Sequence, residues 1–447
     1  MTVRMEERYL GGRPSFAYGV GLFAIALGAF AGLYALWLSG HHETYVALTR
    51  FWGIDTWTRP FLDLSTVLSW GECQRLGVDI LETNPCGPIG GPLSYGPPLL
   101  ALPFGVRDTT LIALPLSLAF LTALPLVLRP RSWEEWMIAV AASLSTATLF
   151  AVERCNLDLF EFLLVALSGP LTASGGTGRL FSYALYYLGG ALKFYPFALL
   201  LLVLRERPRI ALLLGALSAI AIAFYAWHYW SALAAIKSML PQFEYDSDTF
   251  GAALLPYGLA DELGFSDTFG LWAALVLFAG FGALGLHLAV RWMRYGPAPD
   301  WNRANFHFLL AGAIVMAGCF VTQSNIDYRA IFLLFMLPGL FDLRNAAGMK
   351  FLKRTFGLAI WAVIFCMWGE FFRRALEKIL NVIDPGRGDD SPWNIVSLAF
   401  FAGRELVWWG LMAVAFAVIL VFVATSPLGM AATAKLAGMR AKYASPT

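Results

Sequence analysis

Long apolar runs separated by short polar segments recur along the whole chain. Many of the runs extend over about 18 residues or more, and a helix of that length crosses roughly 30 Å of hydrocarbon at about 1.5 Å per residue. This pattern predicts an all-α, polytopic membrane protein with about ten transmembrane helices. The predicted spans are 15–39, 109–128, 136–151, 158–173, 210–230, 269–290, 305–322, 329–343, 355–380 and 395–424.

One further apolar run, 180–204, has basic residues at both ends. If this run crossed the membrane once, the basic residues of all later loops would change sides, which the positive-inside rule disfavours. Pro196 divides the run into two legs that average about 12 residues, and a leg of this length reaches roughly the middle of the bilayer. We therefore predict a re-entrant hairpin with Lys193 near its tip, which requires the tip to line a polar cavity inside the protein.

Basic residues sort to one side of the membrane when this hairpin is included. The segments predicted to be cytoplasmic hold more basic than acidic residues, and the outer segments show the reverse. By the positive-inside rule, both termini are cytoplasmic and the polar cavity faces outward. We expect a single membrane domain over residues 1–447, located in a bacterial inner (plasma) membrane.

The first predicted outer loop, 40–108, is rich in Trp, Pro and Gly. This composition disfavours disorder, so we expect short helices lying along the outer surface. Cys73 and Cys86 both lie in this loop. A disulfide between them and a pair of free thiols are both compatible with the sequence.

The composition agrees with a membrane protein and argues against other classes. Hydrophobic residues make up 58% of the chain and charged residues 14%, so the chain is more apolar than a soluble core of this size requires. The net charge of +2 and the lack of a basic stripe with interleaved aromatics give no sign of a nucleic-acid partner. Residues 246–248 resemble an acidic metal-binding pair, but no further ligands are near in sequence, so no metal is predicted.

Polar residues stand out at five places along the chain. Ionisable groups at membrane depth are costly, so each needs a partner, a water-filled cavity or a function. On the predicted topology four of these places lie on the outer side, and the fifth reaches toward them from mid-membrane. We therefore expect one cavity that opens outward. The five places are Asp63, 95–98, 153–158, 193–196 and 324–329.

Asp63 follows the aromatic Phe61 by two residues and precedes the apolar stretch 64–70. We expect it to open an amphipathic surface helix over the cavity. A carboxylate in that place is suited to accept a proton from an incoming hydroxyl. The alternative is a helix cap or a solvated loop charge, which is the commoner role of a loop aspartate.

The segment 153–158 supports two interpretations, which are compatible. In one, it is a tight turn in which Glu153 pairs with Arg154 and a polar side chain caps the next helix. In the other, Arg154 contacts an anion while Asn156 and Asp158 hold a sugar by hydrogen bonds.

Lys193 has no acidic residue within one helical turn and lies too deep to reach water easily. We expect it to bind an anion, and the phosphate of a lipid carrier would lie at this depth. Arg329 is a second candidate for the phosphate, unless Asp327 simply neutralises it. Arg404 and Glu405, an adjacent pair in the last predicted span, are expected to be structural.

The order of these motifs resembles the GT-C superfamily of membrane glycosyltransferases, and within it glycosyltransferase family 87, the polyprenol-phosphate-sugar-dependent mannosyltransferase-like proteins. Asp63 is similar to the family's catalytic aspartate, and Asn84-Pro85-Cys86 followed by Tyr95 and Pro97 is similar to its loop signature. Residues 153–158 resemble the family's Glu-Arg-Gly-Asn-x-Asp, with Cys155 in place of glycine. Residues 193–196 resemble its Lys-x-Tyr-Pro, and 327–329 its late Asp-Tyr-Arg; together these motifs cover residues 15–345.

The resemblance implies a GT-C-like helical bundle that transfers a sugar, with inversion, from a polyprenyl-phosphate donor to an acceptor at the outer face. No nucleotide sugar, metal or other cofactor is implied, and the expected partners are the donor and membrane lipid. Asp63 would be the catalytic base. The donor phosphate would be bound by Lys193, Arg329 and Arg154, and the sugar or acceptor by Tyr95, Asn156, Asp158, Asn325 and Asp327.

Two other classes of function are compatible with these residues. A transporter or flippase of an anionic or lipid-linked substrate would also use an intramembrane lysine, a broken helix and an outward cavity, although the sequence has no internal repeat. A polymerase or ligase acting on lipid-linked glycans is expected to have a large late outer loop with arginines, whereas 381–394 is short. The sequence does not identify the sugar, the acceptor or a protein partner.

Overall fold

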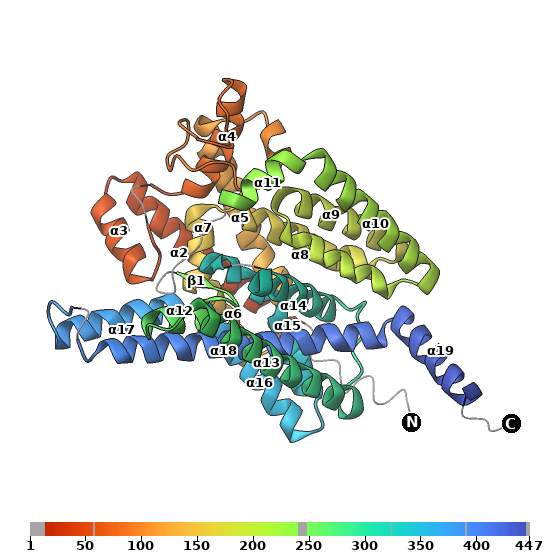
Figure 1. Cartoon of the computed structure of the whole chain (residues 1–447). Helices are drawn as coiled ribbons and strands as arrows, with labels where there is room; N and C mark the ends of the chain where they lie inside the picture. Colours follow the sequence, from red (N-terminus) through yellow and green to blue (C-terminus); the bar gives the residue numbers. More distant parts are fainter. Residues whose placement is uncertain (1–13, 57–58, 240–247, 323, 389–390, 444–447) are drawn as a thin grey trace.

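The computed structural model describes residues 14–56, 59–239, 248–322, 324–388 and 391–443. Its secondary structure is almost entirely helical, which confirms the all-α prediction (Figure 1). The strands of the described residues, β1 (Thr249–Phe250) and β2 (Asn325–Ile326), form a short antiparallel ribbon.

Most helices follow one another with short connections, and the longest described connection lies within the first predicted outer loop, 40–108. In chain order they are α2 (Phe16–Leu38), α3 (His42–Phe51), α4 (Leu62–Arg75), η1 (Pro97–Ala101), η2 (Val106–Asp108), α5 (Thr109–Leu128), α6 (Trp133–Ser143), α7 (Thr146–Arg154), α8 (Asp158–Ala173), α9 (Gly176–Lys193), η3 (Tyr195–Arg205), α10 (Pro208–His228), α11 (Trp230–Met239), α12 (Leu254–Glu262), α13 (Asp267–Tyr295), α14 (Ala304–Thr322), η4 (Asp327–Phe335), α15 (Met336–Ala346), α16 (Lys350–Met367), α17 (Gly369–Ile383), α18 (Asn394–Thr425) and α19 (Pro427–Tyr443).

Several helices are long and apolar enough to cross a membrane, so the chain is a multi-pass membrane protein. Among the described residues there are 6 such helices, or up to 8 if each of two bent pairs counts as one span. The predicted number of ten is not confirmed. The span predicted at 158–173 is α8, which has only 16 residues, and the span predicted at 329–343 is divided between η4 and α15. Both segments are largely buried in protein, so their length need not match the thickness of the hydrocarbon.

The two bent pairs correspond to single predicted spans. Helices α6 and α7 meet at 46°, and Ser145 caps the start of α7 by accepting a hydrogen bond from the backbone N–H of Thr148. Helices α16 and α17 meet at 61°, so the run predicted as one span at 355–380 changes direction at Trp368. Helix α17 carries several charged side chains, which explains why it does not continue the apolar α16.

The predicted hairpin is present as a reversal between α9 and η3. Phe194, which separates them, has a positive φ of 63°. At the far end of the two legs, the Arg179 guanidinium lies 2.5 Å from the Glu206 carboxylate, which shows that the legs run back alongside each other. The reversal falls at Phe194 rather than at Pro196, because Pro196 occupies the first turn of η3, where its missing N–H costs no hydrogen bond.

The first outer loop folds into short helices, as predicted, and is held by a disulfide. Cys73 and Cys86 are bonded, which settles the pairing that the sequence left open. The expectation of an amphipathic surface helix after Asp63 is wrong, because α4 is buried along most of its length. Other parts of the loop cover it; the Trp70 indole donates to the Gly91 carbonyl over 3.0 Å.

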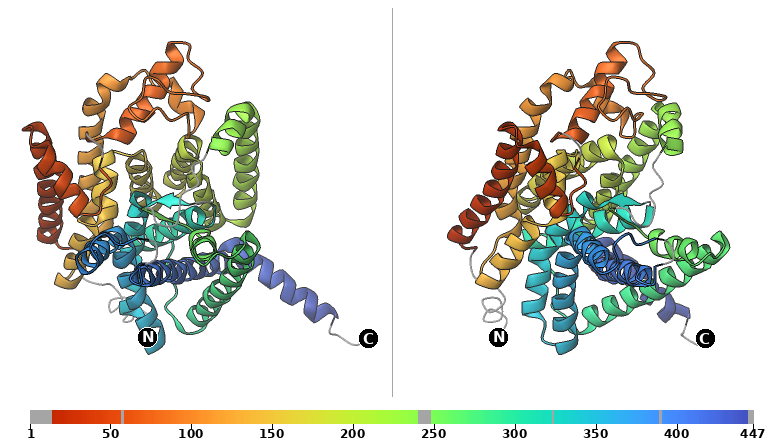
Figure 2. Two further views of the ribbon diagram at one scale, coloured as in Figure 1. Left: turned by 60° about the vertical axis from the view of Figure 1, so that its left-hand side comes forward. Right: turned by 90° about the vertical axis from the view of Figure 1, so that its left-hand side faces the viewer.

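Segments predicted to face opposite sides of the membrane lie at opposite ends of the molecule. At one end, the first outer loop meets the α7–α8 turn and the hairpin tip; the Gly96 N–H donates to the Leu192 carbonyl over 2.8 Å. At the other end, Arg131 pairs with Asp342 at 2.5 Å. Helix α4 stands at the first end and α19 at the other in both views of Figure 2.

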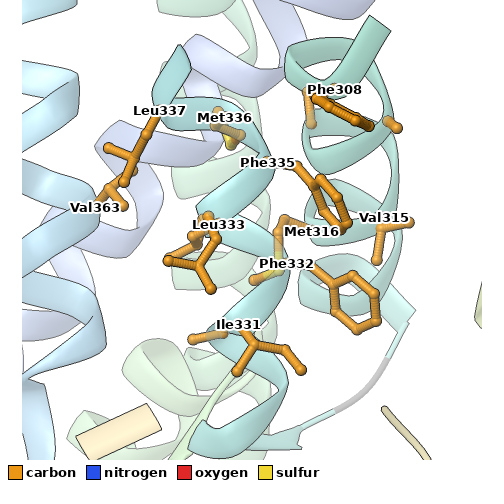
Figure 3. Packing of buried hydrophobic residues seen from close by; sticks show 14 of the residues in the cluster. Phe308, Val315, Met316, Ile331, Phe332, Leu333, Phe335, Met336, Leu337 and Val363 are labelled. Carbon is orange, nitrogen blue, oxygen red and sulfur yellow. The ribbon is translucent and has the colours of Figure 1, made fainter. Parts of the chain in front are cut away.

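Segment η4–α15 forms the centre of the hydrophobic core. Phe332 and Phe335 are completely buried and point toward α14, with Phe335 directed at Phe308, while Leu337 faces Val363 on α16 (Figure 3). Burial of aromatic side chains of this size stabilises the core by roughly 1.5–3 kcal/mol each. Because η4 begins directly after β2, this packing fixes the position of the polar residues at the start of η4.

Candidate active site

Four separate parts of the chain bring the predicted site residues together. They are the start of α4, the turn between α7 and α8, the hairpin tip and the β2–η4 junction. The Phe61 N–H donates to the Glu153 carbonyl over 2.7 Å, and Phe61 itself has a φ of 63°. This left-handed residue turns the chain sharply into α4, so that Asp63 faces the α7–α8 turn.

The Asp63 carboxylate is held by neighbouring side chains and remains partly exposed. Its Oδ2 accepts a hydrogen bond from Asn156 Nδ2 at 2.5 Å. Arg154 Nη1 lies 3.7 Å from its Oδ1, and 18% of the side chain is exposed. The carboxylate is therefore oriented by neighbours yet accessible, which a general base requires.

Asn156 connects Asp63 to Lys193. Its Oδ1 accepts from Lys193 Nζ at 2.5 Å and from the backbone N–H of Asp158 at 3.0 Å. Its Nδ2 donates to Asp63 and also to the Tyr95 hydroxyl at 3.1 Å. The predicted role of Asn156 was to hold a sugar, but the side chain is fully buried and its hydrogen-bonding capacity is used within the protein. In this arrangement it positions the groups on either side of it.

The turn that presents Asn156 depends on Cys155. Cys155 has a φ of 46° and ends α7 in the left-handed conformation that glycine adopts most easily. The side chain is completely buried, with its Sγ 3.8 Å from the Ala113 carbonyl. The cysteine thus occupies a backbone conformation that glycine adopts at less cost.

Lys193 has a carboxylate partner, contrary to the expectation from sequence. Its Nζ lies 2.7 Å from Asp158 Oδ1 and 4.5 Å from the centre of the Tyr95 ring. Asp158 is on α8, so no inspection of residues within one turn of Lys193 could find it. The pairing explains how a buried lysine is tolerated, since a buried charge needs a partner.

Asp158 is shared by two cations. Besides Lys193, its carboxylate faces Arg329, whose Nε lies 3.5 Å from Oδ2, and it accepts from the Tyr195 hydroxyl at 2.5 Å. Arg329 also donates to Asn325 and lies over the Tyr195 ring at 5.1 Å. Two positive charges therefore share one negative charge. Asp158, predicted to bind a sugar, is fully buried and neutralises the cations instead.

A cavity of about 510 Å³ lies beside these cations. It is bounded by the hairpin tip, the end of α14 and the β2–η4 junction, and its described lining contains Lys193 and Arg329 but no carboxylate. Tyr95 lines it too, and the same hydroxyl contacts Asn156, which in turn holds Asp63. We call this space the hairpin cavity.

Five predicted site residues do not line the hairpin cavity. Asp63, Asn156 and Asp158 connect to it through the contacts given above, whereas Arg154 and Asp327 point to other groups. Arg154 donates to the Asp55 carbonyl at 2.5 Å and lies 3.5 Å from the Glu153 carboxylate, which agrees with the turn interpretation of 153–158. In the described part of the chain Asp327 forms no ion pair with Arg329, and the cation whose charge acts on its carboxyl is Arg404. Its backbone N–H donates to the Asp248 carbonyl at 2.8 Å. Arg404 pairs with Glu405 at 2.9 Å, as expected.

Two polar residues near the site were missed by the sequence interpretation. The Tyr45 hydroxyl donates to Glu153 at 2.6 Å, and burial together with the Glu153 charge raises the pKa of Tyr45. Glu161 is buried one helical turn after Asp158. The three-residue spacing in an otherwise apolar helix was the available signal for Glu161, whereas nothing in the sequence marked Tyr45.

No model of a known protein family, no curated protein and no solved structure matches this chain. The resemblance to the GT-C glycosyltransferases therefore rests on the sequence motifs alone. Within the described residues, no group of three or more His, Cys, Asp or Glu side chains is placed to hold a metal ion. Residues 246 and 247 of the acidic segment considered above lie outside the described part of the chain.

Proposed function

We propose that this protein is a membrane glycosyltransferase that moves a sugar from a polyprenyl-phosphate donor to an acceptor hydroxyl at the outer face of the membrane. The observation that carries the proposal is the hydrogen-bonded chain from Asp63 through Asn156 to Lys193, which joins a partly open carboxylate to a cationic cavity. Asn156 thus holds both a base and a residue of an anion site. This arrangement suits a transfer reaction in which a phosphate is the leaving group.

The donor phosphate binds between Lys193 and Arg329. A sugar esterified to polyprenyl phosphate is a phosphodiester with one negative charge, and the two cations exceed their shared carboxylate Asp158 by one positive charge. Charge-assisted hydrogen bonds from Lys and Arg to phosphate are short and strong. The apolar part of the lining, which includes Phe194 and Ala198 of the hairpin, suits the first part of the lipid chain.

The reaction then follows as a single displacement. The acceptor hydroxyl oxygen attacks the anomeric carbon from the face opposite the phosphate, and Asp63 accepts its proton. The bond between that carbon and the phosphate oxygen breaks, and the phosphate leaves with its charge stabilised by Lys193 and Arg329. Attack from the opposite face inverts the anomeric configuration. Asn156 keeps the base and the phosphate site at a constant separation.

The proposed setting is a bacterial inner membrane, with both termini cytoplasmic and the Asp63 end facing outward. It is supported by the positive-inside rule and by the meeting of the predicted outer segments at one end of the molecule. In this proposal the α9–η3 hairpin is re-entrant. Its tip lines the polar hairpin cavity inside the protein and so avoids contact with lipid. The proposal needs no cofactor.

The test is a transfer assay on purified protein in lipid nanodiscs. Mass spectrometry of the co-purifying lipid identifies the donor, which is then supplied with a radioactive sugar. The Asp63→Asn variant is expected to lose transfer by at least about 100-fold, the lower range for a general base, while keeping the co-purified lipid. Glu82→Gln, which alters an exposed carboxylate of the same loop, is the control. Wild-type turnover in Asp63→Asn, or dependence on a nucleotide sugar, would contradict the proposal.

The same assay separates an enzyme from a carrier. A nanodisc encloses no second compartment, so a transporter or flippase has no compartment into which to move its substrate. Formation of a glycosylated acceptor under these conditions supports transfer. Movement of the lipid across sealed vesicles without any glycosylated product would favour the carrier.

A further inference from the structure

A second cavity, of about 380 Å³, lies among α12, α17 and α18. None of its lining residues lines the hairpin cavity. We call it the α17 cavity. Its polar lining includes Glu262, Arg373, Glu377, Arg387 and Arg404.

The α17 cavity lies at the same end of the molecule as the candidate active site. Helix α17 packs on α3 of the first outer loop, where the rings of Phe51 and Phe371 are 5.8 Å apart. Arg404 donates to the Thr249 carbonyl on β1 at 3.0 Å, and β1 pairs with β2, which carries Asn325. The β1–β2 ribbon therefore connects the two cavities, because Arg404 contacts β1 and Arg329 contacts Asn325 of β2.

The charges of the α17 cavity are balanced, unlike those of the hairpin cavity. Glu370 is shared by Arg373 at 2.7 Å and Arg374 at 2.5 Å, and Glu262 in the lining adds a further carboxylate. Arg404 pairs with Glu405 at 2.9 Å. Arg387 pairs with Glu377 near the opening. Because each guanidinium already faces a carboxylate, an anionic ligand would gain little there. A neutral ligand that both donates and accepts hydrogen bonds can use the arginines and the carboxylates together.

Arg404 supplies a donor without a partner in the described part of the chain. Its side chain is 2% exposed, and its Nη1 makes no hydrogen bond there, although Nε and Nη2 do. A buried donor left unsatisfied costs about 1–3 kcal/mol. Because Arg404 also lines the cavity, we expect a ligand hydroxyl to accept a hydrogen bond from its guanidinium. The rings of Phe400 and Phe401 also line the cavity, so flat apolar surface adjoins the polar groups.

We propose that the α17 cavity binds a neutral carbohydrate through its hydroxyl groups. Closely spaced donors and acceptors beside aromatic rings are suited to a sugar ring, which has hydroxyls at its edge and C–H groups on its faces. The further assignment of this sugar as part of the glycan acceptor rests on the proposed function. The binding itself does not, because it involves no residue of the hairpin cavity.

Binding is measured by saturation-transfer NMR on the full-length protein in lipid nanodiscs, because the headgroup of a maltoside detergent is itself a sugar. The probes are neutral trisaccharides of glucose, galactose and mannose, and glucose 6-phosphate is the anionic comparison. At least one neutral trisaccharide is expected to bind saturably, with glucose 6-phosphate binding no more tightly than its neutral counterpart glucose.

Two variants test the location of the site. Leu376→Trp fills the cavity, and Arg387→Gln removes a charged donor near its opening. Each is expected to weaken trisaccharide binding by about tenfold or more. Lys378→Gln is the matched control, because Lys378 is on the same helix but lies over the Phe51 ring, outside the cavity. Thermal melting confirms that each variant is folded.

The possible outcomes distinguish this proposal from the proposed function. Asp63→Asn is expected to bind the trisaccharide like the wild type while failing to transfer sugar. If the wild-type protein binds a trisaccharide but transfers no sugar, the proposed function is contradicted and the carbohydrate site is supported. Absence of binding by every trisaccharide, preference for glucose 6-phosphate, or unchanged binding in both Leu376→Trp and Arg387→Gln would overturn it.

Discussion

The two polar cavities contain similar cations but differ in how carboxylates are distributed around them. In the hairpin cavity, Lys193 and Arg329 share the buried Asp158, and no carboxylate lines the wall. In the α17 cavity, every lining arginine pairs with a carboxylate, although Arg373 shares Glu370 with Arg374, and two carboxylates belong to the lining. The number of arginines is therefore a poor guide to the ligand. The excess of positive over negative charge is the informative quantity, and it favours an anion in the first cavity and a neutral ligand in the second.

The largest effect on ligand binding is expected when the excess positive charge of the hairpin cavity is removed. Lys193→Gln keeps a group that hydrogen-bonds with Asn156 but removes the positive charge. Because Arg329 then faces Asp158 alone, the excess disappears, and donor affinity is expected to fall by about 10-fold to 100-fold. Mass spectrometry of the co-purified lipid measures the loss.

The same variant gives a direct contrast with the α17 cavity. Lys193→Gln should leave neutral trisaccharide binding unchanged, and Arg387→Gln should leave the donor lipid unchanged. If either substitution affected both ligands equally, the two cavities would not be separate sites.

A second, smaller effect is expected from Gly96, where the first outer loop touches the hairpin. A Cβ at this position would lie 1.9 Å from the Ala191 carbonyl oxygen, a backbone atom that cannot move aside easily. Gly96→Ala should displace Tyr95 from the hairpin cavity, lower transfer by about tenfold and destabilise the fold by about 1–3 kcal/mol.

Gly91→Ala is the control for this substitution, because a Cβ there meets no atom within 4 Å. Transfer assays and thermal melting of both variants provide the measurement. Equal behaviour of the two variants would show that the contact between the loop and the hairpin does not position the site.

The disulfide belongs only to the loop that covers the hairpin cavity. Cys73 and Cys86 close a short loop, with a sequence separation of 13. The chain-entropy model assigns about 3 kcal/mol to a loop of this size. The double variant Cys73→Ser/Cys86→Ser should therefore melt a few degrees lower than the wild type, and a reductant should shift only the wild type. A reductant-sensitive double variant would point to another cause.

The smallest expected effect concerns Asp248, beside the ribbon between the cavities. Burial, and then the nearby charges of Glu370 and Asp55, raise the pKa of Asp248 to about 6. In the unfolded chain this pKa is about 3.9. The folded protein therefore binds more protons between about pH 4 and 6, and its stability falls as the pH rises through that range.

Asp248→Asn should flatten this dependence and raise the melting temperature slightly at neutral pH. Melting curves at several pH values between 4 and 7 test it. Asp300→Asn, which alters an exposed carboxylate 3.4 Å from Arg303, is the control. An unchanged slope in Asp248→Asn would show that another group titrates in this range.

The sequence was informative wherever the physical signal is local. Apolar run length predicted the helical membrane fold, and charge asymmetry predicted the reversal near Pro196. Two cysteines in one loop offered the pairing that the structure contains. The polar motifs also predicted which segments meet, since Asp63, Tyr95, Asn156 and Lys193 are joined by hydrogen bonds.

The sequence by itself determined that this chain is a helical, multi-pass membrane protein with its unusual polar residues gathered at one end. Tertiary structure alone decided how their charges are shared. Lys193 pairs with Asp158 on another helix, and Asp327 lies by Arg404 although Arg329 is only two residues away. The reason is that charge pairing depends on distances of a few ångströms between side chains of different helices. Such distances follow from packing around η4 and α15, which no local pattern records.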